Sequence, residues 1–169
     1  GAELTPLYYA ACWHSGPPGE QIRERLECIS VLLEAGASVD KLVCGATPLY
    51  HVVASSLFED RADEIAALVE ALVKAGADVN WEKGTSVLAG AAARCTAATV
   101  KCLISAGAVD LDRALVKAID NGKQRNCAPL LRAGASLPPH ITDTNPLPTR
   151  AYIEKIRAAG GYRAYEKAH

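Results

Sequence analysis

A short pattern that recurs along the chain limits its possible folds more than any other feature of the sequence. The pattern opens with Thr-Pro-Leu-Tyr at residues 5–8 and 47–50, and the Thr-Ser-Val-Leu of residues 85–88 is a looser copy. Each unit closes with an aliphatic pair, two further residues and Gly-Ala, and the closing glycines are Gly36, Gly76, Gly107 and Gly134. A unit repeated at this spacing predicts a solenoid, in which each repeat buries its apolar face against its neighbours.

Two helices are predicted within each unit. A Thr followed by Pro is a helix start, because Thr caps the first backbone N–H groups and Pro occupies the first helical position without losing a hydrogen bond. The closing glycine adopts the left-handed conformation that ends a helix. We therefore expect first helices at about residues 5–13, 48–55 and 85–94, and second helices at about residues 20–35, 62–75 and 97–106.

The second helices carry an apolar stripe on one face. In the second unit this stripe consists of Ile65, Leu68, Val69 and Leu72. The charged residues of these helices, among them Arg25, Glu64 and Glu70, are assigned to the opposite, solvated face.

The fourth unit is degenerate and lacks the opening motif. Asp110 or Asp112 is expected to cap its first helix. Its second helix contains Pro129, which would break a helix interior. With Asn126 as the N-cap, Pro129 falls within the first turn, so a short helix over residues 127–133 is predicted.

The chain ends in two segments of different character. A Pro-rich extended linker is predicted at residues 137–148, since proline disfavours helix at the residue before it. A helical segment is predicted at residues 149–169, where Tyr152, Ile153 and Ile156 are expected to cover the exposed face of the fourth unit.

The opening and closing motifs, taken together, resemble the ankyrin repeat. The resemblance covers residues 3–136 and divides them into repeats at about 3–40, 44–80, 83–110 and 111–136. It implies an all-α solenoid of about four helix-turn-helix repeats with short projecting turns, closed by a C-terminal capping helix. The C-terminal segment at residues 150–162 also resembles the segment that closes many ankyrin proteins of single-celled algae.

The sequence departs from the family's pattern in two ways. The family usually has His after Thr-Pro-Leu, where it ties one repeat's turn to the next, whereas Tyr8 and Tyr50 stand there in this chain. A phenol is expected to replace the imidazole. The first two repeats are also longer than the family's spacing, which implies inserts between their paired helices, around residues 13–23 and 56–63.

Composition excludes several classes of partner. The formal net charge is -1, so no overall field attracts nucleic acid or anionic lipid. The basic excess at residues 145–169 is interpreted as a solvated helix face and not as a nucleic-acid site. The sequence holds no run of about 18 uncharged apolar residues, so no membrane span is predicted.

The six cysteines lie mostly in apolar helical patterns, without a Cys-x-x-Cys motif or a His at ligand spacing. We expect reduced thiols, no metal and no cofactor. Reduced thiols indicate an intracellular, reducing compartment such as the cytoplasm or nucleus, or an organelle if a targeting peptide has been removed.

A catalytic site would need a nucleophile, a base and an orienting group that converge on one pocket. The histidines fall in different units, and no nucleophile motif lies beside any of them. We therefore expect a non-catalytic protein without a small-molecule substrate.

Binding of another protein is the function that the repeats favour. The residues expected to contact a partner are Lys41, Leu42, Val43, Trp81 and Glu82 on the turns, and Trp13, His14, Leu57 and Phe58 in the inserts. An exposed Trp is a frequent centre of binding energy, although Trp81 could instead fold back onto the neighbouring turn. Packing within the protein is likewise the alternative for Leu42, Val43 and the inserts.

Two functions are compatible with these features. The first is an adaptor that holds a protein partner through its turn tips and concave helix faces. The alternative is a structural or linker subunit built permanently into a large multiprotein assembly and clamped by the inserts and the C-terminal tail. The outer face of the first repeat lacks a neighbour, so either further repeats precede Gly1 or a partner covers that face.

Overall fold

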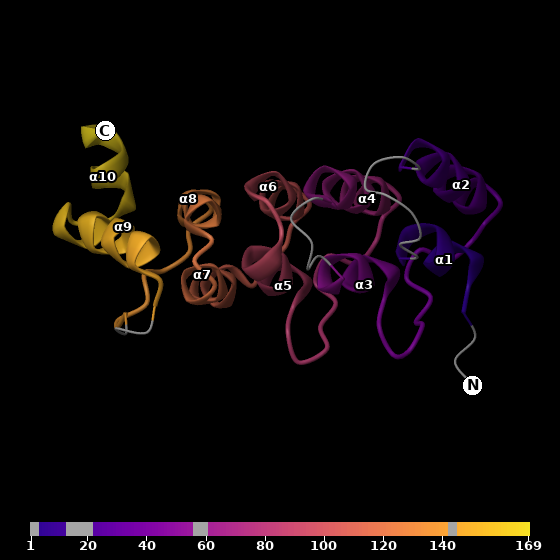
Figure 1. The fold of residues 1–169 in the computed structure, drawn as a ribbon, viewed down its shortest axis with the longest axis horizontal. Helices are drawn as coiled ribbons and strands as arrows, with labels where there is room; N and C mark the ends of the chain where they lie inside the picture. Colours follow the sequence, from indigo (N-terminus) through magenta and orange to yellow (C-terminus); the bar gives the residue numbers. More distant parts are fainter. Residues whose placement is uncertain (1–3, 13–21, 56–60, 142–144) are drawn as a thin grey trace.

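The computed structural model describes residues 4–12, 22–55, 61–141 and 145–169. Within these residues the chain forms ten helices, eight of which stack in two layers into an elongated solenoid (Figure 1). The inner layer contains α1 (Pro6–Cys12), α3 (Pro48–Ala54), α5 (Val87–Arg94) and α7 (Leu111–Asp120). The outer layer contains α2 (Ile22–Glu34), α4 (Ala62–Lys74), α6 (Ala97–Ser105) and α8 (Gln124–Arg132). The predicted all-α solenoid is confirmed.

The inner helices begin at the predicted capping residues. The Thr47 hydroxyl accepts a hydrogen bond from the backbone N–H of Tyr50 at 3.3 Å, and Thr5 caps α1 in the same way. In the third repeat the cap is Ser86, one residue later than the expected Thr85, and its hydroxyl accepts from the N–H of Ala89. Thr85 belongs to the preceding turn.

The outer helices end at the predicted glycines. Gly76, for example, has φ 86°, which is the left-handed region that a residue with a Cβ rarely adopts. The next residue, Ala77, then donates its N–H back to the carbonyl oxygen of Leu72 at 3.0 Å. The chain is thereby turned toward the next repeat.

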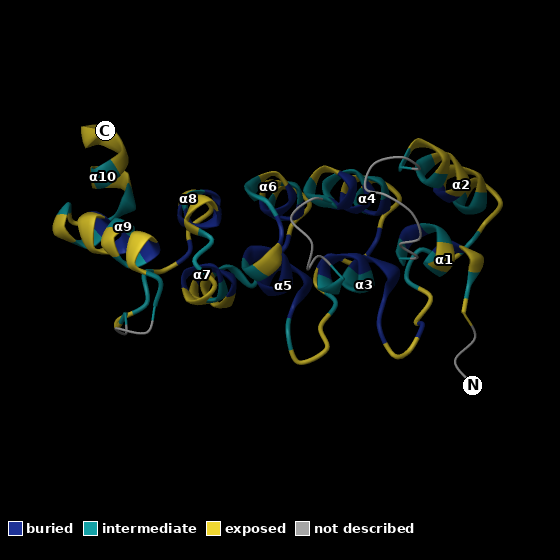
Figure 2. Cartoon of the chain, viewed as in Figure 1, coloured by how far each residue is buried: buried dark blue, intermediate teal, exposed yellow. Residues whose placement is uncertain are grey.

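The core lies between the two layers, where buried residues form a continuous band (Figure 2). The predicted stripe of α4 is almost fully buried, with relative exposures of 2% or less. In α2 only Ile29 is buried, because no repeat packs on its outer side within the described part of the chain.

The fourth repeat differs from the prediction at its second helix. α8 begins at Gln124, so Asn126 lies inside it and Pro129 lies beyond the first turn. Asn126 does not cap α8, because its buried side-chain amide donates to the carbonyl oxygens of Ala92 at 2.9 Å and Cys95 at 3.0 Å. It therefore joins the third and fourth repeats.

The first helix of that repeat has the expected N-cap residue without the expected capping bond. Asp110 precedes α7, but its carboxylate accepts from the Ser86 hydroxyl at 2.5 Å and pairs with Arg113 at 3.3 Å. The bond to Ser86 ties the start of α7 to the start of α5.

The C-terminal segment closes the solenoid. It forms α9 (Leu147–Ala158), which begins two residues before the predicted start, and α10 (Tyr162–Ala168). Ile153 and Ile156 of α9 are fully buried, as expected for a cap. Tyr152 is half-buried beside Tyr165, and burial raises its pKa to about 12.

Candidate functional site

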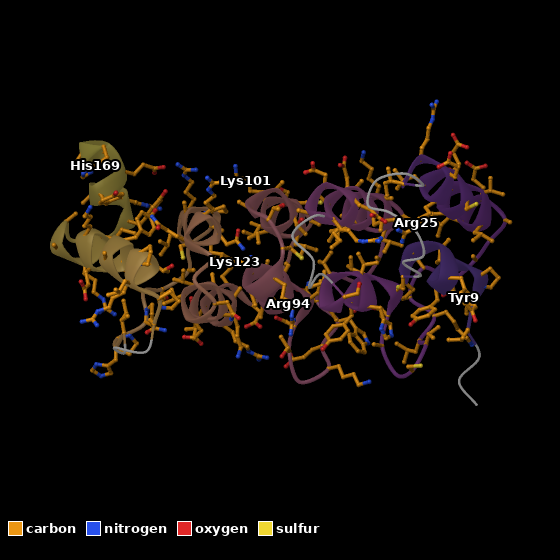
Figure 3. All side chains as sticks on the ribbon, in the orientation of Figure 1. Tyr9, Arg25, Arg94, Lys101, Lys123 and His169 are labelled. Carbon is orange, nitrogen blue, oxygen red and sulfur yellow. The ribbon has the colours of Figure 1, made fainter. Side chains whose placement is uncertain are left out.

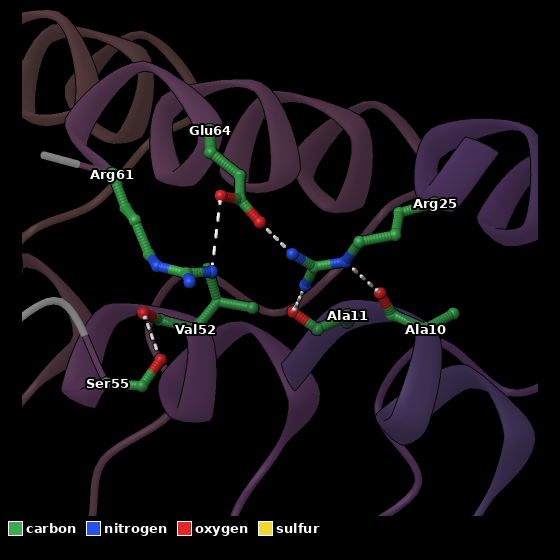
Figure 4. A network of polar contacts seen from close by, with 7 residues as sticks. All are labelled: Ala10, Ala11, Arg25, Val52, Ser55, Arg61 and Glu64. Carbon is green, nitrogen blue, oxygen red and sulfur yellow. Dashed lines mark hydrogen bonds and ion pairs between the residues drawn. The ribbon is translucent and has the colours of Figure 1, made fainter. Parts of the chain in front are cut away.

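A buried ionic cluster lies between the first two repeats (Figure 4). Arg25 of α2 pairs with Glu64 of α4, and Arg61 lies 3.6 Å from the same carboxylate. The guanidinium of Arg25 also donates to the carbonyl oxygens of Ala10 at 3.0 Å and Ala11 at 2.8 Å.

These contacts correct the prediction that Arg25 and Glu64 face solvent. Their side chains are only 13% and 6% exposed, and Figure 3 shows Arg25 between the layers. Burial lowers the pKa of Arg25, and its acceptors and counter-ion offset the loss of water. The cluster connects three helices, which makes it a structural joint between repeats.

An aromatic row runs along the inner layer on the side from which the turns project. Successive ring centroids lie 6.2 Å apart between Tyr9 and Tyr8, and 5.0 Å apart between Tyr8 and His51. The row continues at 6.4 Å to Tyr50 and at 5.0 Å to Trp81. Each pair meets edge to face, which is a favourable arrangement of aromatic rings.

Hydrogen bonds hold this row against the two projecting turns. The His51 ring nitrogen Nε2 lies 2.7 Å from the Val43 carbonyl oxygen, and the Tyr50 hydroxyl donates to the Lys83 carbonyl oxygen at 3.4 Å. The phenol of Tyr50 thus reaches the next turn, as predicted. The imidazole of His51 was not predicted to hold a turn, although it directly follows the position where the family has His. The ammonium of Lys83 donates to the Cys44 carbonyl oxygen at 2.9 Å and links the turns.

A second set of hydrogen bonds joins the segments at the ends of the outer helices in successive repeats. The Asp40 carboxylate accepts from the N–H of Asp78 at 3.1 Å. The Asn80 side chain accepts from the N–H of Val109 at 3.1 Å and donates to the Gly107 carbonyl oxygen at 3.2 Å. Between α6 and α7 the chain is short, so in the described structure turns project only between the first three repeats (Figure 1).

The predicted partner residues of the first turn lie in different environments. Leu42 is 52% exposed at the tip, and Lys41 beside it is also exposed. Val43 is 1% exposed, because its backbone pairs with Ala46 and turns its side chain into the core. Val43 therefore leaves the set of proposed contact residues.

On the second turn, Trp81 is half-buried and packs on Tyr50, which is the alternative of folding back described above. Glu82 is exposed and pairs with Arg113 at 2.7 Å. The insert residues Trp13, His14, Leu57 and Phe58 lie outside the described residues.

Metal ligands, reactive thiols and membrane-spanning helices are the other possible kinds of site. Among the described residues, no group of three or more His, Cys, Asp or Glu side chains could hold a metal ion. All six cysteines are free, and burial raises the pKa of Cys12 and Cys127 to about 12. The helices in the described part of the chain are too short or too polar to cross a bilayer.

Comparison with known proteins agrees with the fold. The family model described as ankyrin repeat matches residues 3–42. Among solved structures, the chain is similar to the crystal structure of an ankyrin repeat domain from Acinetobacter baumannii AYE, with 26% sequence identity and a TM-score of 0.62. That alignment covers 93% of this chain and 98% of the other. No curated protein matches.

Proposed function

We propose that this chain, an ankyrin-repeat solenoid, is a non-catalytic module that binds another protein through its turn tips and inner helices. Ankyrin repeats are generally protein–protein interaction modules, and their fold is typically non-enzymatic. Stacked repeats present one extended surface to which several repeats contribute. Such a surface suits a macromolecular partner.

The aromatic row is the observation that carries this proposal. It crosses the first two repeats and reaches the turn that begins the third. One end is Tyr9, which is 42% exposed, and the other is the half-buried Trp81. Tyr and Trp are enriched among the residues that dominate binding energy. Leu42 adds an exposed apolar group at the adjacent tip, and Lys41 and Glu82 add charges of both signs.

Rings that are already packed together lose little conformational freedom when a partner binds. The contacts among Tyr50, His51 and Trp81 therefore hold these rings in place before a partner binds. We propose Tyr9, Lys41, Leu42, Trp81 and Glu82 as contact residues.

The six free thiols support a reducing, intracellular compartment as the place of action.

Site-specific photo-crosslinking would test the proposal. A photoreactive residue at Leu42, on the turn, is compared in extracts of the source cells with one at Lys101, which is exposed on the outer layer (Figure 3). We expect a defined protein adduct from position 42 and none from position 101. Equal labelling from both positions would show that the turns have no special role.

Two substitutions separate binding from folding in the same assay. Leu42→Ala should reduce the adduct formed from a probe at Lys41 and leave stability unchanged, because Leu42 contributes little to the core. Trp81→Ala should reduce it about tenfold or more, and should lower stability by about 1 kcal/mol through loss of the Tyr50 contact. An undiminished adduct in both variants would contradict the proposed surface.

A further inference from the structure

An apolar groove of about 580 Å³ opens at the N-terminal end of the solenoid. Its described lining comes from α1 and α2 and consists of Pro6, Ala10, Glu24, Arg25, Cys28 and Leu32. Pro6 and Cys28 are exposed, and Ala10 and Leu32 are half-buried. Figure 2 shows the corresponding difference, since α2 has far less buried surface than α4.

Two of the groove residues of α2, Cys28 and Leu32, occupy positions that are buried in every later repeat. Cys28 and Leu32 lie eight and four residues before the closing glycine Gly36. The residues at these positions in the later repeats are at most 2% exposed, namely Leu68, Thr99 and Asn126 for the first position and Leu72, Leu103 and Leu130 for the second. Among the residues that the structure describes, Cys28 is exposed and Leu32 is half-buried, so these positions are less covered in the first repeat than in the later ones.

The groove residues of α1 follow the same rule in the second and third repeats, whereas in α7 the first residue, Leu111, is half-buried and the fifth, Leu115, is buried. Pro6 and Ala10 are the first and fifth residues of their helix. Their counterparts are Pro48 and Val52 in α3, and Val87 and Ala91 in α5, all of which are buried.

Direct contacts show which neighbour covers these positions. Asn126 donates to the carbonyl oxygens of Ala92 in α5 and of Cys95, the C-cap residue of α5, both of which belong to the preceding repeat. The Pro48 carbonyl oxygen accepts from the Cys12 thiol of the preceding repeat, with the sulfur 3.7 Å away. In each later repeat, the surface at the equivalent position packs against the preceding repeat. The groove is the corresponding surface of the first repeat.

The charged groove residue Glu24 also has a buried counterpart in the second repeat. Glu24 lies twelve residues before Gly36, as Glu64 lies twelve residues before Gly76. Glu64 is buried and paired with Arg25 of the preceding repeat, whereas Glu24 is exposed. A helix pair stacked on the groove with a cation at the position of Arg25 would pair with Glu24.

We propose that the groove is the docking site of a further ankyrin-type helix pair, stacked ahead of the first repeat, with an arginine or lysine that pairs with Glu24. A second copy of this chain is not the occupant that we propose. The side by which a repeat meets its successor is covered by the next repeat in the first three repeats, and in the fourth repeat α9 and α10 lie against α8. This site is separate from the aromatic row and does not depend on the proposed function.

A variant with a duplicated first repeat tests whether a helix pair can stack on the groove. A second copy of residues 5–46 is inserted between Leu4 and Thr5, which reproduces the natural junction of Ala46 with a Thr-Pro helix start. In the copy, Cys28 and Cys44 are replaced by Ser, so that alkylation reports on the original Cys28. The rate of its reaction with iodoacetamide is measured by peptide mass spectrometry against the original Cys44.

We expect the duplicated repeat to slow alkylation of Cys28 about tenfold or more, because stacking buries the thiol. Arg25→Ala in the copy should reverse much of this protection. Arg23→Ala in the copy is the matched control, since the Arg23 side chain is 88% exposed in the first repeat. Unchanged reactivity of Cys28 in a folded duplication, or equal effects of the two substitutions, would overturn the proposal.

The native protein provides a second measurement that does not depend on folding of the duplication. Cys28 and Cys44 are alkylated in intact source cells and in the purified chain of residues 1–169. Selective protection of Cys28 in cells, removed by denaturant, supports a docked helix pair. Equal reactivity in cells and in the purified chain, or protection that appears only when the purified chain is concentrated, overturns it.

Discussion

The Arg25–Glu64 pair allows a quantitative test of how the first two repeats are joined. Replacing Glu64 by Gln keeps the shape of the side chain and removes its charge. Arg25, only 13% exposed, would then lose its counter-ion while Arg61 remains nearby. Two guanidinium groups would be left without the carboxylate between them.

The expected loss follows from the burial of the pair. Removing one partner of a buried ion pair costs about 3–5 kcal/mol. Arg25 keeps two backbone acceptors, at Ala10 and Ala11, so the lower end of this range applies. We therefore expect Glu64→Gln to lower the free energy of unfolding by about 3 kcal/mol, which corresponds to a fall of about 6–12 °C in Tm for a chain of this size.

Urea unfolding followed by far-UV circular dichroism measures this loss, and hydrogen exchange shows whether it is concentrated in α1 and α2. Glu70→Gln is the matched control on the same helix, because Glu70 is exposed and pairs with Lys74 at the surface. The control should lose less than about 0.5 kcal/mol. Arg25→Met combined with Glu64→Leu should recover much of the stability. A loss for Glu64→Gln no larger than for Glu70→Gln would refute this reasoning.

Two further predictions concern the buried polar groups. Asn126→Ala removes the two buried hydrogen bonds from this side chain to the carbonyl oxygens of Ala92 and Cys95. The urea midpoint should therefore fall by an amount equivalent to about 2 kcal/mol. Gln124→Ala, at an exposed position of the same helix, should have no measurable effect, and similar losses in the two variants would contradict the prediction. Burial raises the pKa of Cys12 and Cys127 from 9.0 to about 12, so the unfolded chain releases these protons first as pH rises. Their contribution to stability is complete below pH 9 and is lost between pH 9 and 12. Urea midpoints should therefore fall as the pH rises through this range, and they should fall less steeply in the Cys12→Ala/Cys127→Ala variant. The same pH dependence in that variant would show that these two thiols do not cause the loss.

The features predicted correctly from the sequence depend on residues close together in the chain. Thr47 and Pro48 specify a helix start within one turn, and Gly76 specifies an end. The stripe at residues 65–72 identifies the buried face by its period alone.

The prediction that Arg25 and Glu64 face solvent was wrong. It followed from the charge of these side chains, whereas their spacing from the apolar residues of the same helices places them on the buried face. Arg25 follows Ile22 by three residues and precedes Ile29 by four, so it lies on the apolar stripe. Glu64 likewise precedes the buried Leu68 by four residues. Charged residues at buried positions need partners, but these partners are 39 residues apart in the chain and meet only when the repeats stack.

The candidate binding surface was predictable only in part. Leu42 and Trp81 follow from the placement of the turns between helices. The aromatic row does not, because Tyr8 and His51 belong to different repeats and come into contact only through stacking. Val43 was misplaced because adjacent residues of a tight turn can point in opposite directions, and the bridge to Ala46 turns this one inward.

The distance between the two projecting turns limits which residues of a ligand can contact both. Packed helices lie about 8–10 Å apart, so the turn that carries Leu42 and the turn that carries Trp81 are separated by that interval, which occurs once in the described chain. A helical ligand laid along the inner layer rises about 1.5 Å per residue, so side chains about five to seven residues apart would lie over the two turns. Side chains seven residues apart share one face of a helix. An extended ligand covers the same interval in about three residues, whose side chains point to opposite sides. A ligand that contacts both turns therefore needs contact residues about five to seven positions apart if it is helical and about two or three positions apart if it is extended.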